Sequence, residues 1–351
     1  MAGNANLGAA KAAKNDEFYT QWNDIENEMQ AYLEYDPDVF RGKVVLLPCD
    51  DPEVSNFTKY FAERFEQLGL KKLISTSYAA DGGNGKVFVL EGENEPQWGY
   101  LAGDGDFRSD EVTALRDEAD IVVTNPPFSL FREFLAWLID GDVEFAVIGN
   151  MNAVTYKEIF PLIKDNEMWP GAAFNKTMEF SVPADYYAAK DAELDKYGNR
   201  LVKVPAISWF TNVEHGRRHE FLKLMTMEDN LVYGSKKVRS AGYPNYDNYD
   251  AIEVPFTSGI PSDYEGVMGV PISFLDKYNP EQFEIVKFRH GDDGKDLGYT
   301  QEDGTYKTPY FRILIRHRNP ERKESQPLSR SRGGRSSMRR KRELSHVEVR
   351  G

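Results

Sequence analysis

The chain has 351 residues, 40% of them hydrophobic and 13% aromatic, and a formal net charge of −14. This composition predicts a globular protein with one large domain or two ordinary ones. Neither an apolar run long enough to cross a membrane nor an apolar leader is present, so no membrane contact and no signal peptide are expected. The single cysteine, Cys49, excludes an internal disulfide and favours a reducing, cytoplasmic compartment. The five scattered histidines and this cysteine form no zinc-binding pattern, so no metal is expected.

Strand-like and helix-like segments alternate along the first half of the chain. An amphipathic helix is predicted from Phe57 to Gly69, and Ser109 is expected to cap a second helix that reaches Glu118. Strands separated by helices indicate βαβ units and a mainly parallel sheet. The predicted strands are 43–47, 72–75, 86–90, 121–123 and 145–148.

The second half of the chain is less regular. A strand is predicted at 206–210, and the strand-like segments 284–288 and 312–315 are expected to pair at a sheet edge. From about Asn319 onward serine, arginine and glycine dominate, which predicts a disordered, basic tail. This tail is interpreted equally well as a solvated cationic segment or as a contact with nucleic acid.

The most informative stretch is 120–128, where a short run of β-branched residues ends at Asn125-Pro126-Pro127-Phe128. Proline lacks an amide donor and restricts the residue before it, so neither strand nor helix can continue through this tetrapeptide. The sequence predicts a stiff loop at the carboxyl end of a buried strand, where open α/β sheets bind ligands. Ser129 is expected to cap the helix that follows, whose apolar residues recur at helical spacing.

This loop suits methylation of an exocyclic amine such as that of adenine, whose nitrogen lone pair is delocalised into the ring. The Asn125 side-chain oxygen and the Pro126 carbonyl could each accept one amino hydrogen, which would direct the lone pair at an electrophilic methyl group. Phe128 offers a flat apolar face on which an extruded base could stack. The alternative interpretation is that Asn-Pro-Pro is only a tight turn and Phe128 only part of the core.

The loop after the first predicted strand is acidic. It carries Asp50 and Asp51 beside Cys49, and its carboxylates could hold the α-amino group of S-adenosylmethionine. Asx side chains are also ordinary turn formers and helix caps.

A second acidic turn lies at 103–107, where Asp106 could accept from the adenine amine of the cofactor and Phe107 could pack on its ring. The turn superficially resembles a calcium loop but lacks the required spacing and closing glutamate. Near the start of the chain, the aromatic and hydroxyl groups of 15–20 could cover a cofactor, or could simply precede the first helix.

The charge distribution gives mixed indications about nucleic acid. An acidic body does not favour DNA binding, because neutralisation of phosphates drives much of that binding. Positive charge is nevertheless concentrated in one part of the second half, and candidate DNA contacts there are Arg217, Arg218, Lys236, Lys237 and Arg239.

Together these segments resemble the EcoRI-type adenine-specific DNA methyltransferases, within the larger family of S-adenosylmethionine-dependent amino-methyltransferases. The resemblance covers about residues 14–315, and its motifs occur in the order of the family. They are Asp16-Glu17-Phe18-Tyr19-Thr20, Cys49-Asp50-Asp51-Pro52, Gly105-Asp106-Phe107, Asn125-Pro126-Pro127-Phe128, Gly149-Asn150-Met151-Asn152-Ala153, Trp209-Phe210-Thr211-Asn212 and Gly266-Val267-Met268-Gly269-Val270-Pro271.

The resemblance implies a Rossmann-like, seven-stranded methyltransferase sheet and transfer of a methyl from S-adenosylmethionine to N6 of an adenine flipped out of double-stranded DNA. It places Asn125, Pro126, Pro127 and Phe128 at the base, and Phe18, Tyr19, Thr20, Cys49, Asp50, Asp51, Asp106 and Phe107 at the cofactor. The glycine-rich cofactor loop of the wider family is absent, as is the acidic residue that commonly binds the ribose.

We therefore expect a flexible N-terminus at 1–13, a catalytic core at 14–215, a target-recognition region with returning strands at 216–315 and a basic tail at 316–351. A monomer without an obligate protein partner is the simplest expectation. Two alternatives stay open. One is an enzyme that methylates adenine in RNA or a glutamine amide in a protein, and the other is a DNA-binding relative without catalytic activity.

Overall fold

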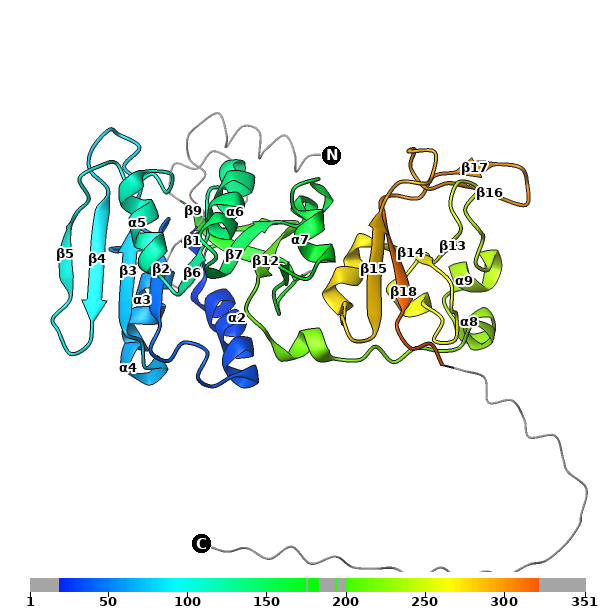
Figure 1. Ribbon diagram of the computed structural model, residues 1–351, viewed down its shortest axis with the longest axis horizontal. Helices are drawn as coiled ribbons and strands as arrows, with labels where there is room; N and C mark the ends of the chain where they lie inside the picture. Colours follow the sequence, from blue (N-terminus) through cyan, green and yellow to red (C-terminus); the bar gives the residue numbers. More distant parts are fainter. Residues whose placement is uncertain (1–18, 175, 183–192, 195–199, 322–351) are drawn as a thin grey trace, which may run out of the picture.

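The structure is a computed structural model that describes residues 19–174, 176–182, 193–194 and 200–321 (Figure 1). The expected flexible N-terminus, Phe18 and residues 322–351 of the basic tail lie outside this part of the chain. Each helix in the described ranges is too short or too polar to cross a lipid bilayer.

An eight-stranded sheet forms the centre of the first half of the chain. Four neighbouring strands pair in parallel, and an antiparallel pair extends the sheet on each side. The sheet is mainly parallel, as expected, but has eight strands rather than seven. Their spatial order is β5 (Gln97–Tyr100), β4 (Lys86–Glu91), β3 (Lys72–Thr76), β2 (Val44–Leu47), β6 (Ile121–Thr124), β7 (Glu144–Asn150), β12 (Ile207–Thr211) and β8 (Trp169–Pro170).

The central strands are apolar throughout because both faces of the sheet are covered by helices. Along β2, Val44 and Leu46 pack into one apolar core while Val45 and Leu47 pack into the other. Figure 1 shows α5 and α6 on one face of the sheet and α2 and α3 on the opposite face. The helices of this region are α2 (Trp22–Tyr35), α3 (Asn56–Glu63), α4 (Phe65–Leu68), α5 (Asp110–Glu118), α6 (Phe131–Asp140) and α7 (Phe160–Lys164).

A serine side chain caps the start of α3 and of α5, but not that of α6. Ser109 caps α5 as expected, because its hydroxyl accepts a hydrogen bond from the backbone of Val112 at 3.2 Å. The expected cap at Ser129 is wrong. The Leu130 amide donates to the Pro127 carbonyl at 2.9 Å, which closes the 3₁₀ turn η1 (Phe128–Leu130), and α6 begins only after it.

The helix predicted from Phe57 onward is interrupted at Arg64, which separates α3 from α4. Ser55 caps α3 and accepts from the Phe57 amide at 3.0 Å. Gly69 ends α4 in the left-handed conformation, with φ of 64°, as the sequence predicts.

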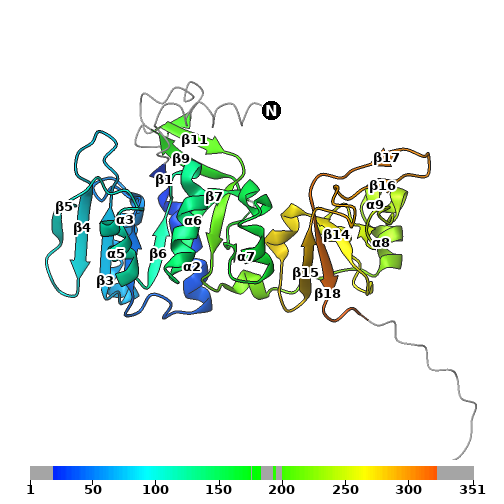
Figure 2. The same cartoon turned by 45° about the horizontal axis from the view of Figure 1, so that its top comes forward.

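A small antiparallel sheet forms a separate layer at one end of the main sheet (Figure 2). In this sheet the first described residues pair with a strand much later in the chain, and Thr20 lies opposite Phe180. The sheet therefore fixes the Tyr19–Thr20 segment beside the carboxyl ends of the central strands. Its strands are β1 (Tyr19–Thr20), β9 (Met178–Val182), β11 (Arg200–Val204) and β10 (Glu193–Leu194).

A third sheet, from the second half of the chain, lies beside α7 (Figure 1). β15 and β18 pair antiparallel, which confirms the pairing expected for 284–288 and 312–315. A buried ion pair of 2.8 Å between Glu253 and Arg312 joins β13 to β18. The elements are β13 (Ile252–Glu253), β14 (Met268–Pro271), β18 (Arg312–His317) and β15 (Phe283–Phe288), with the hairpin β16 (Tyr299–Thr300) and β17 (Tyr306–Lys307), and the helices α8 (Met227–Tyr233) and α9 (Lys236–Ala241).

Short 3₁₀ turns complete the connections between these elements. They are η2 (Met151–Thr155), η4 (Gly216–His219), η5 (Thr257–Gly259) and η6 (Ile272–Lys277). The third sheet and the main sheet are packed together, since Phe160 of α7 stacks on Phe288 of β15 with ring centroids 4.8 Å apart.

Candidate active site

A cavity of about 380 Å³ lies where the loops after β2, β3 and β6 meet. This is the carboxyl edge of the parallel strands, where the sequence places its ligand site. The volume falls within the range of small-molecule sites, about 300–1,000 Å³. The predicted site residues that line the cavity are Tyr19, Thr20, Cys49, Asp50, Asp51, Asp106, Phe107, Asn125 and Pro127.

The Asn125-Pro126-Pro127-Phe128 loop leaves β6 directly after Thr124, as predicted. Asn125 and Pro127 face the cavity, whereas Pro126 is buried behind it. The Phe128 ring is half-buried and packs edge-to-face against Phe180 of β9, with ring centroids 6.5 Å apart. The loop therefore presents its asparagine to the cavity and is supported by the small second sheet.

Asp50 is buried, and two hydroxyl groups already bind its carboxylate. Thr124 Oγ1 donates to Oδ2 at 2.6 Å, and Ser55 Oγ donates to Oδ1 at 2.7 Å. Burial raises the pKa of Asp50 to about 7, and the hydrogen bonds from Thr124 and Ser55 oppose this rise because they stabilise the ionised form. These contacts disfavour the expected role of Asp50 as the group that holds the cofactor amine.

The other two acidic residues of the cavity are paired with cations. Asp51 forms an ion pair of 2.9 Å with Lys86, and Asp106 forms one of 2.6 Å with Arg108. The Arg108 hydrogen bonds hold the pKa of Asp106 below its usual value, so this carboxyl stays ionised. Both carboxylates remain partly exposed and keep acceptor capacity for a ligand.

Phe107 lines the cavity, but its ring is only 4% exposed and belongs to the core. It packs edge-to-face against Phe134 at 5.0 Å and Trp137 at 5.6 Å, measured between ring centroids. This packing disfavours the predicted stacking of Phe107 on a cofactor ring, because the ring is buried against α6 and the Arg108 guanidinium carbon lies 5.5 Å from its centroid.

Thr20 provides an open hydrogen-bonding position in the cavity wall. Its Oγ1 is buried and has no hydrogen-bond partner in the part of the chain that the structure describes. Its carbonyl accepts a hydrogen bond of 2.8 Å from the Asn56 side chain, which fixes this segment over α3. A buried hydroxyl without a partner is costly, so a ligand atom bound here would remove that cost.

Sequence reasoning missed several residues of the cavity wall. Ser77 and Tyr78 follow β3, and their position next to β2 at the carboxyl edge of the sheet could have indicated them. Gly105 lies in the acidic turn with φ of 84°, and a Cβ there would collide with the Ser77 carbonyl. Further residues of the wall are Ser55, Asn56, Arg108 and Leu130.

The structure disfavours the predicted DNA contacts of Arg217 and Arg218, because both guanidinium groups are paired within the protein. Arg218 is 4% exposed and lies over the Trp169 ring, and it forms an ion pair of 3.2 Å with Glu214. Arg217 donates to the Ala172 carbonyl at 2.6 Å and forms an ion pair of 2.6 Å with Asp276.

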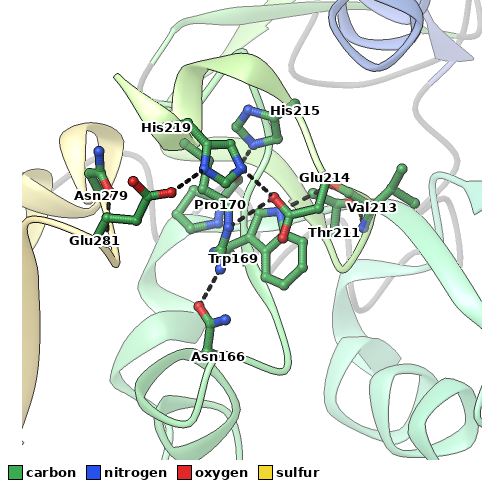
Figure 3. A network of polar contacts seen from close by, with 11 residues as sticks. Asn166, Trp169, Pro170, Thr211, Val213, Glu214, His215, His219, Asn279 and Glu281 are labelled. Atoms are coloured by element: carbon green, nitrogen blue, oxygen red, sulfur yellow. Dashed lines mark hydrogen bonds and ion pairs between the residues drawn. The ribbon is translucent and has the colours of Figure 1, made fainter. Parts of the chain in front are cut away.

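A polar network surrounds this segment (Figure 3). His219 lies between Glu214 at 2.9 Å and Glu281 at 3.3 Å, so it joins η4 to the loop before β15. His215 lies 3.0 Å from the Pro170 carbonyl oxygen. The network therefore gives the cations of this segment partners within the protein.

The remaining predicted DNA contacts have a different environment. Lys236, Lys237 and Arg239 are exposed on α9, and Lys237 Nζ lies 5.3 Å from the centroid of the Phe256 ring. α9 belongs to the third sheet region and thus lies apart from the cavity wall. In the described ranges no group of three or more histidine, cysteine, aspartate or glutamate residues is arranged to hold a metal ion.

The mainly parallel sheet, the cavity at its carboxyl edge and the Asn-Pro-Pro-Phe loop together define an α/β methyltransferase. The family model described as adenine-specific methyltransferase EcoRI matches residues 6–98 and 89–330. The chain is 47% identical over 342 residues to the type II methyltransferase M.EcoRI of Escherichia coli, covering 91% of this chain and 99% of that protein. The chain therefore belongs to the EcoRI family of adenine-specific methyltransferases.

A second relative extends the comparison to another organism. The chain is 40% identical over 280 residues to the type II methyltransferase M.MpnI of Mycoplasma pneumoniae, covering 79% of this chain and 83% of that protein. No solved structure matches the chain. Membership of the family implies a methyl donor and an adenine acceptor.

Proposed function

We propose that this enzyme transfers a methyl group from S-adenosylmethionine to N6 of an adenine flipped out of double-stranded DNA. One observation carries the proposal. The Asn125 loop and the loops proposed to bind the cofactor line the same cavity of about 380 Å³. Donor and acceptor would therefore meet in one cavity, which is what an in-line transfer requires.

The residues of the cavity fit S-adenosylmethionine, which supplies an electrophilic methyl on a cationic sulfur. The ionised Asp106 and the partly exposed Asp51 give the cavity acceptors for the positive and hydrogen-bonding groups of this cofactor. Thr20 adds a buried hydroxyl without a partner in the described ranges. Ser77 and Tyr78 would stand where other methyltransferases hold the ribose with an acidic residue.

The catalytic role is assigned to the Asn125 loop. The Asn125 side-chain oxygen and the Pro126 carbonyl would accept the two amino hydrogens of adenine, and this would localise the lone pair on nitrogen. The mechanism needs no general base before transfer, because the amine is neutral. Proline at two positions keeps the acceptors in place while the base enters, since a proline backbone has little freedom.

Phe128, at the end of the Asn-Pro-Pro-Phe loop, would contact the flipped base. The edge-to-face contact with Phe180 restrains the Phe128 ring before the base arrives, although the ring does not line the cavity in this structure. Unstacking an adenine costs a few kcal/mol, and a prepared aromatic surface offsets part of that cost.

Residues 216–315 are proposed as the target-recognition region, attached to a catalytic core at 14–215. This region has its own sheet and carries α9, whose three exposed cations are the remaining candidates for phosphate contacts. The type II names of the relatives support a role in a restriction-modification system. A DNA substrate and the single cysteine both support a cytoplasmic enzyme.

The test is transfer of a labelled methyl from S-adenosylmethionine to duplex DNA, RNA and a glutamine-containing peptide in parallel. Nucleoside analysis of the labelled DNA should give N6-methyladenine as the product. Label in RNA or peptide but not in DNA would overturn the choice of substrate. Cofactor binding without any transfer would favour a non-catalytic relative.

A further inference from the structure

One buried carboxylate joins the loop after β2 to the catalytic loop. Thr124 is the last residue of β6 and the immediate neighbour of Asn125, and its hydroxyl donates to Asp50 at 2.6 Å. Ser55, which caps α3, donates to the other carboxylate oxygen of Asp50 at 2.7 Å. Asp50, Ser55 and Thr124 are 6%, 4% and 0% exposed. Little of these three side chains is therefore open to water.

We propose that Asp50 is a positioning residue for methyl transfer, which holds the Asn125 loop at a fixed place relative to the donor cavity. The inference rests on the proposed function and adds to it. It assigns Asp50 a task other than binding the cofactor amine. The carboxylate acts through Thr124 and does not itself touch the transferred methyl.

The backbone of Asp50 is fixed as firmly as its side chain. The Asp50 amide donates to the Thr76 carbonyl at 2.9 Å, and the Asp50 carbonyl accepts from Ser75 Oγ at 2.7 Å. Both partners belong to β3, so one residue connects the carboxyl ends of three neighbouring strands, β3, β2 and β6. Asp50 can therefore serve as a rigid reference point for the loops that surround the cavity.

The stiffness of the catalytic loop transmits this restraint. Asn125 precedes Pro126, which limits its backbone conformations, and Pro127 follows. A displacement at Thr124 is then passed on to the Asn125 amide rather than absorbed by intervening flexible residues. A misplacement of about 1 Å at a reacting centre can reduce the rate by about 100-fold.

The test uses Thr124→Val, which keeps the shape of the side chain but removes the hydroxyl. We expect kcat to fall by about 10- to 100-fold, because a misplacement of about 1 Å at the reacting centre costs up to about 100-fold in rate. The dissociation constant of S-adenosylmethionine, measured by calorimetry, should change little. Thr124→Ser restores a hydroxyl and should recover most of the lost kcat.

Thr211→Val is the matched control. Thr211 is also a fully buried strand threonine, and its hydroxyl donates to the Phe145 carbonyl at 2.7 Å, but it lies in β12 away from the cavity wall. Its loss should lower the free energy of unfolding, as expected for a buried hydrogen bond, without a matching loss of kcat.

Asp50→Asn is a second variant, in which the new side chain has nearly the same size as the aspartate it replaces. Its amide nitrogen cannot accept a hydroxyl hydrogen, so at least one of the two contacts is altered, and kcat should again fall while the donor still binds. Wild-type kcat in Thr124→Val, or equal kcat losses in Thr124→Val and Thr211→Val, would overturn the inference alone. Failure of the wild type to methylate any acceptor would overturn the proposed function, and the inference with it.

Discussion

The guanidinium of Arg218 lies over the Trp169 ring, with its central carbon 3.7 Å from the ring centroid. Trp169 belongs to β8 at the edge of the main sheet, and Arg218 lies on the segment that leaves this sheet for the third one. Burial lowers the pKa of Arg218, and Glu214 opposes this effect by stabilising the charge. The pair therefore fastens the connecting segment to the core.

Arg218→Ala should destabilise the protein by about 3 kcal/mol, because it removes a buried, paired cation and its cation–π contact. Urea unfolding measures this change. The salt dependence of DNA binding should be the same as in the wild type, since the side chain does not reach solvent. A reduced salt dependence with unchanged stability would show that the residue contacts phosphate after all.

The exposed cations of α9 should contribute to DNA binding rather than to stability, in contrast to Arg218. Replacing Lys236, Lys237 and Arg239 by glutamine should leave stability nearly unchanged and should weaken DNA binding. The slope of log K against log salt concentration should become shallower by about 2–3, at about 0.9 for each lost phosphate contact. Arg217→Gln is the control, because its guanidinium is already paired with Asp276, and its slope should match that of the wild type.

Gly105 should be required for donor binding because its backbone conformation and its close contact both exclude a side chain. Gly105→Ala places a Cβ against the Ser77 carbonyl at φ of 84°, so the cavity wall must move and the dissociation constant of S-adenosylmethionine should rise. Gly82 has nearly the same φ, 82°, but a Cβ there would meet nothing within 4 Å. Gly82→Ala should cost about 1 kcal/mol of stability and leave donor binding intact.

His215 should make the protein sensitive to acid. Burial lowers its pKa to about 4 from an ordinary value of 6.5, although the Pro170 carbonyl favours the charged ring. The unfolded chain binds a proton at higher pH than the native state does, so this stabilising contribution is complete above pH 6.5. It is then lost as the pH falls toward 4.

The measurement compares wild type with His215→Gln at pH 7 and pH 5. The difference in free energy of unfolding between the two proteins should shrink by about 2 kcal/mol at the lower pH. A difference that is independent of pH would show that His215 does not titrate in the folded protein as described.

The four central parallel strands and the position of the cavity could be predicted because they depend on local chemistry, whereas strands such as β5, β9 and β11 were not predicted. The apolar run before Asn125, the two prolines and the cap at Ser109 each restrict the backbone within a few residues. The start of α6 could not be predicted in the same way. The Pro127 carbonyl closes a 3₁₀ turn with Leu130, and this competes with a cap by Ser129.

The environment of individual site residues depended on partners far away in the sequence. Asp50 is 74 residues from Thr124, and the Glu281 partner of His219 is 62 residues away. Composition alone cannot distinguish a buried arginine such as Arg218 from an exposed cation such as Lys236. The two side chains differ in the tertiary structure, because Arg218 packs on Trp169 whereas Lys236 is exposed on α9.

The most direct test of the central claim is the methyl-transfer rate of Asn125→Ala on duplex DNA, measured with saturating S-adenosylmethionine. The rate should fall to near background while calorimetry shows an almost unchanged dissociation constant for the cofactor, because the lost amide contacts the acceptor amine and not the donor. A rate near that of the wild type would contradict the assignment of the catalytic loop.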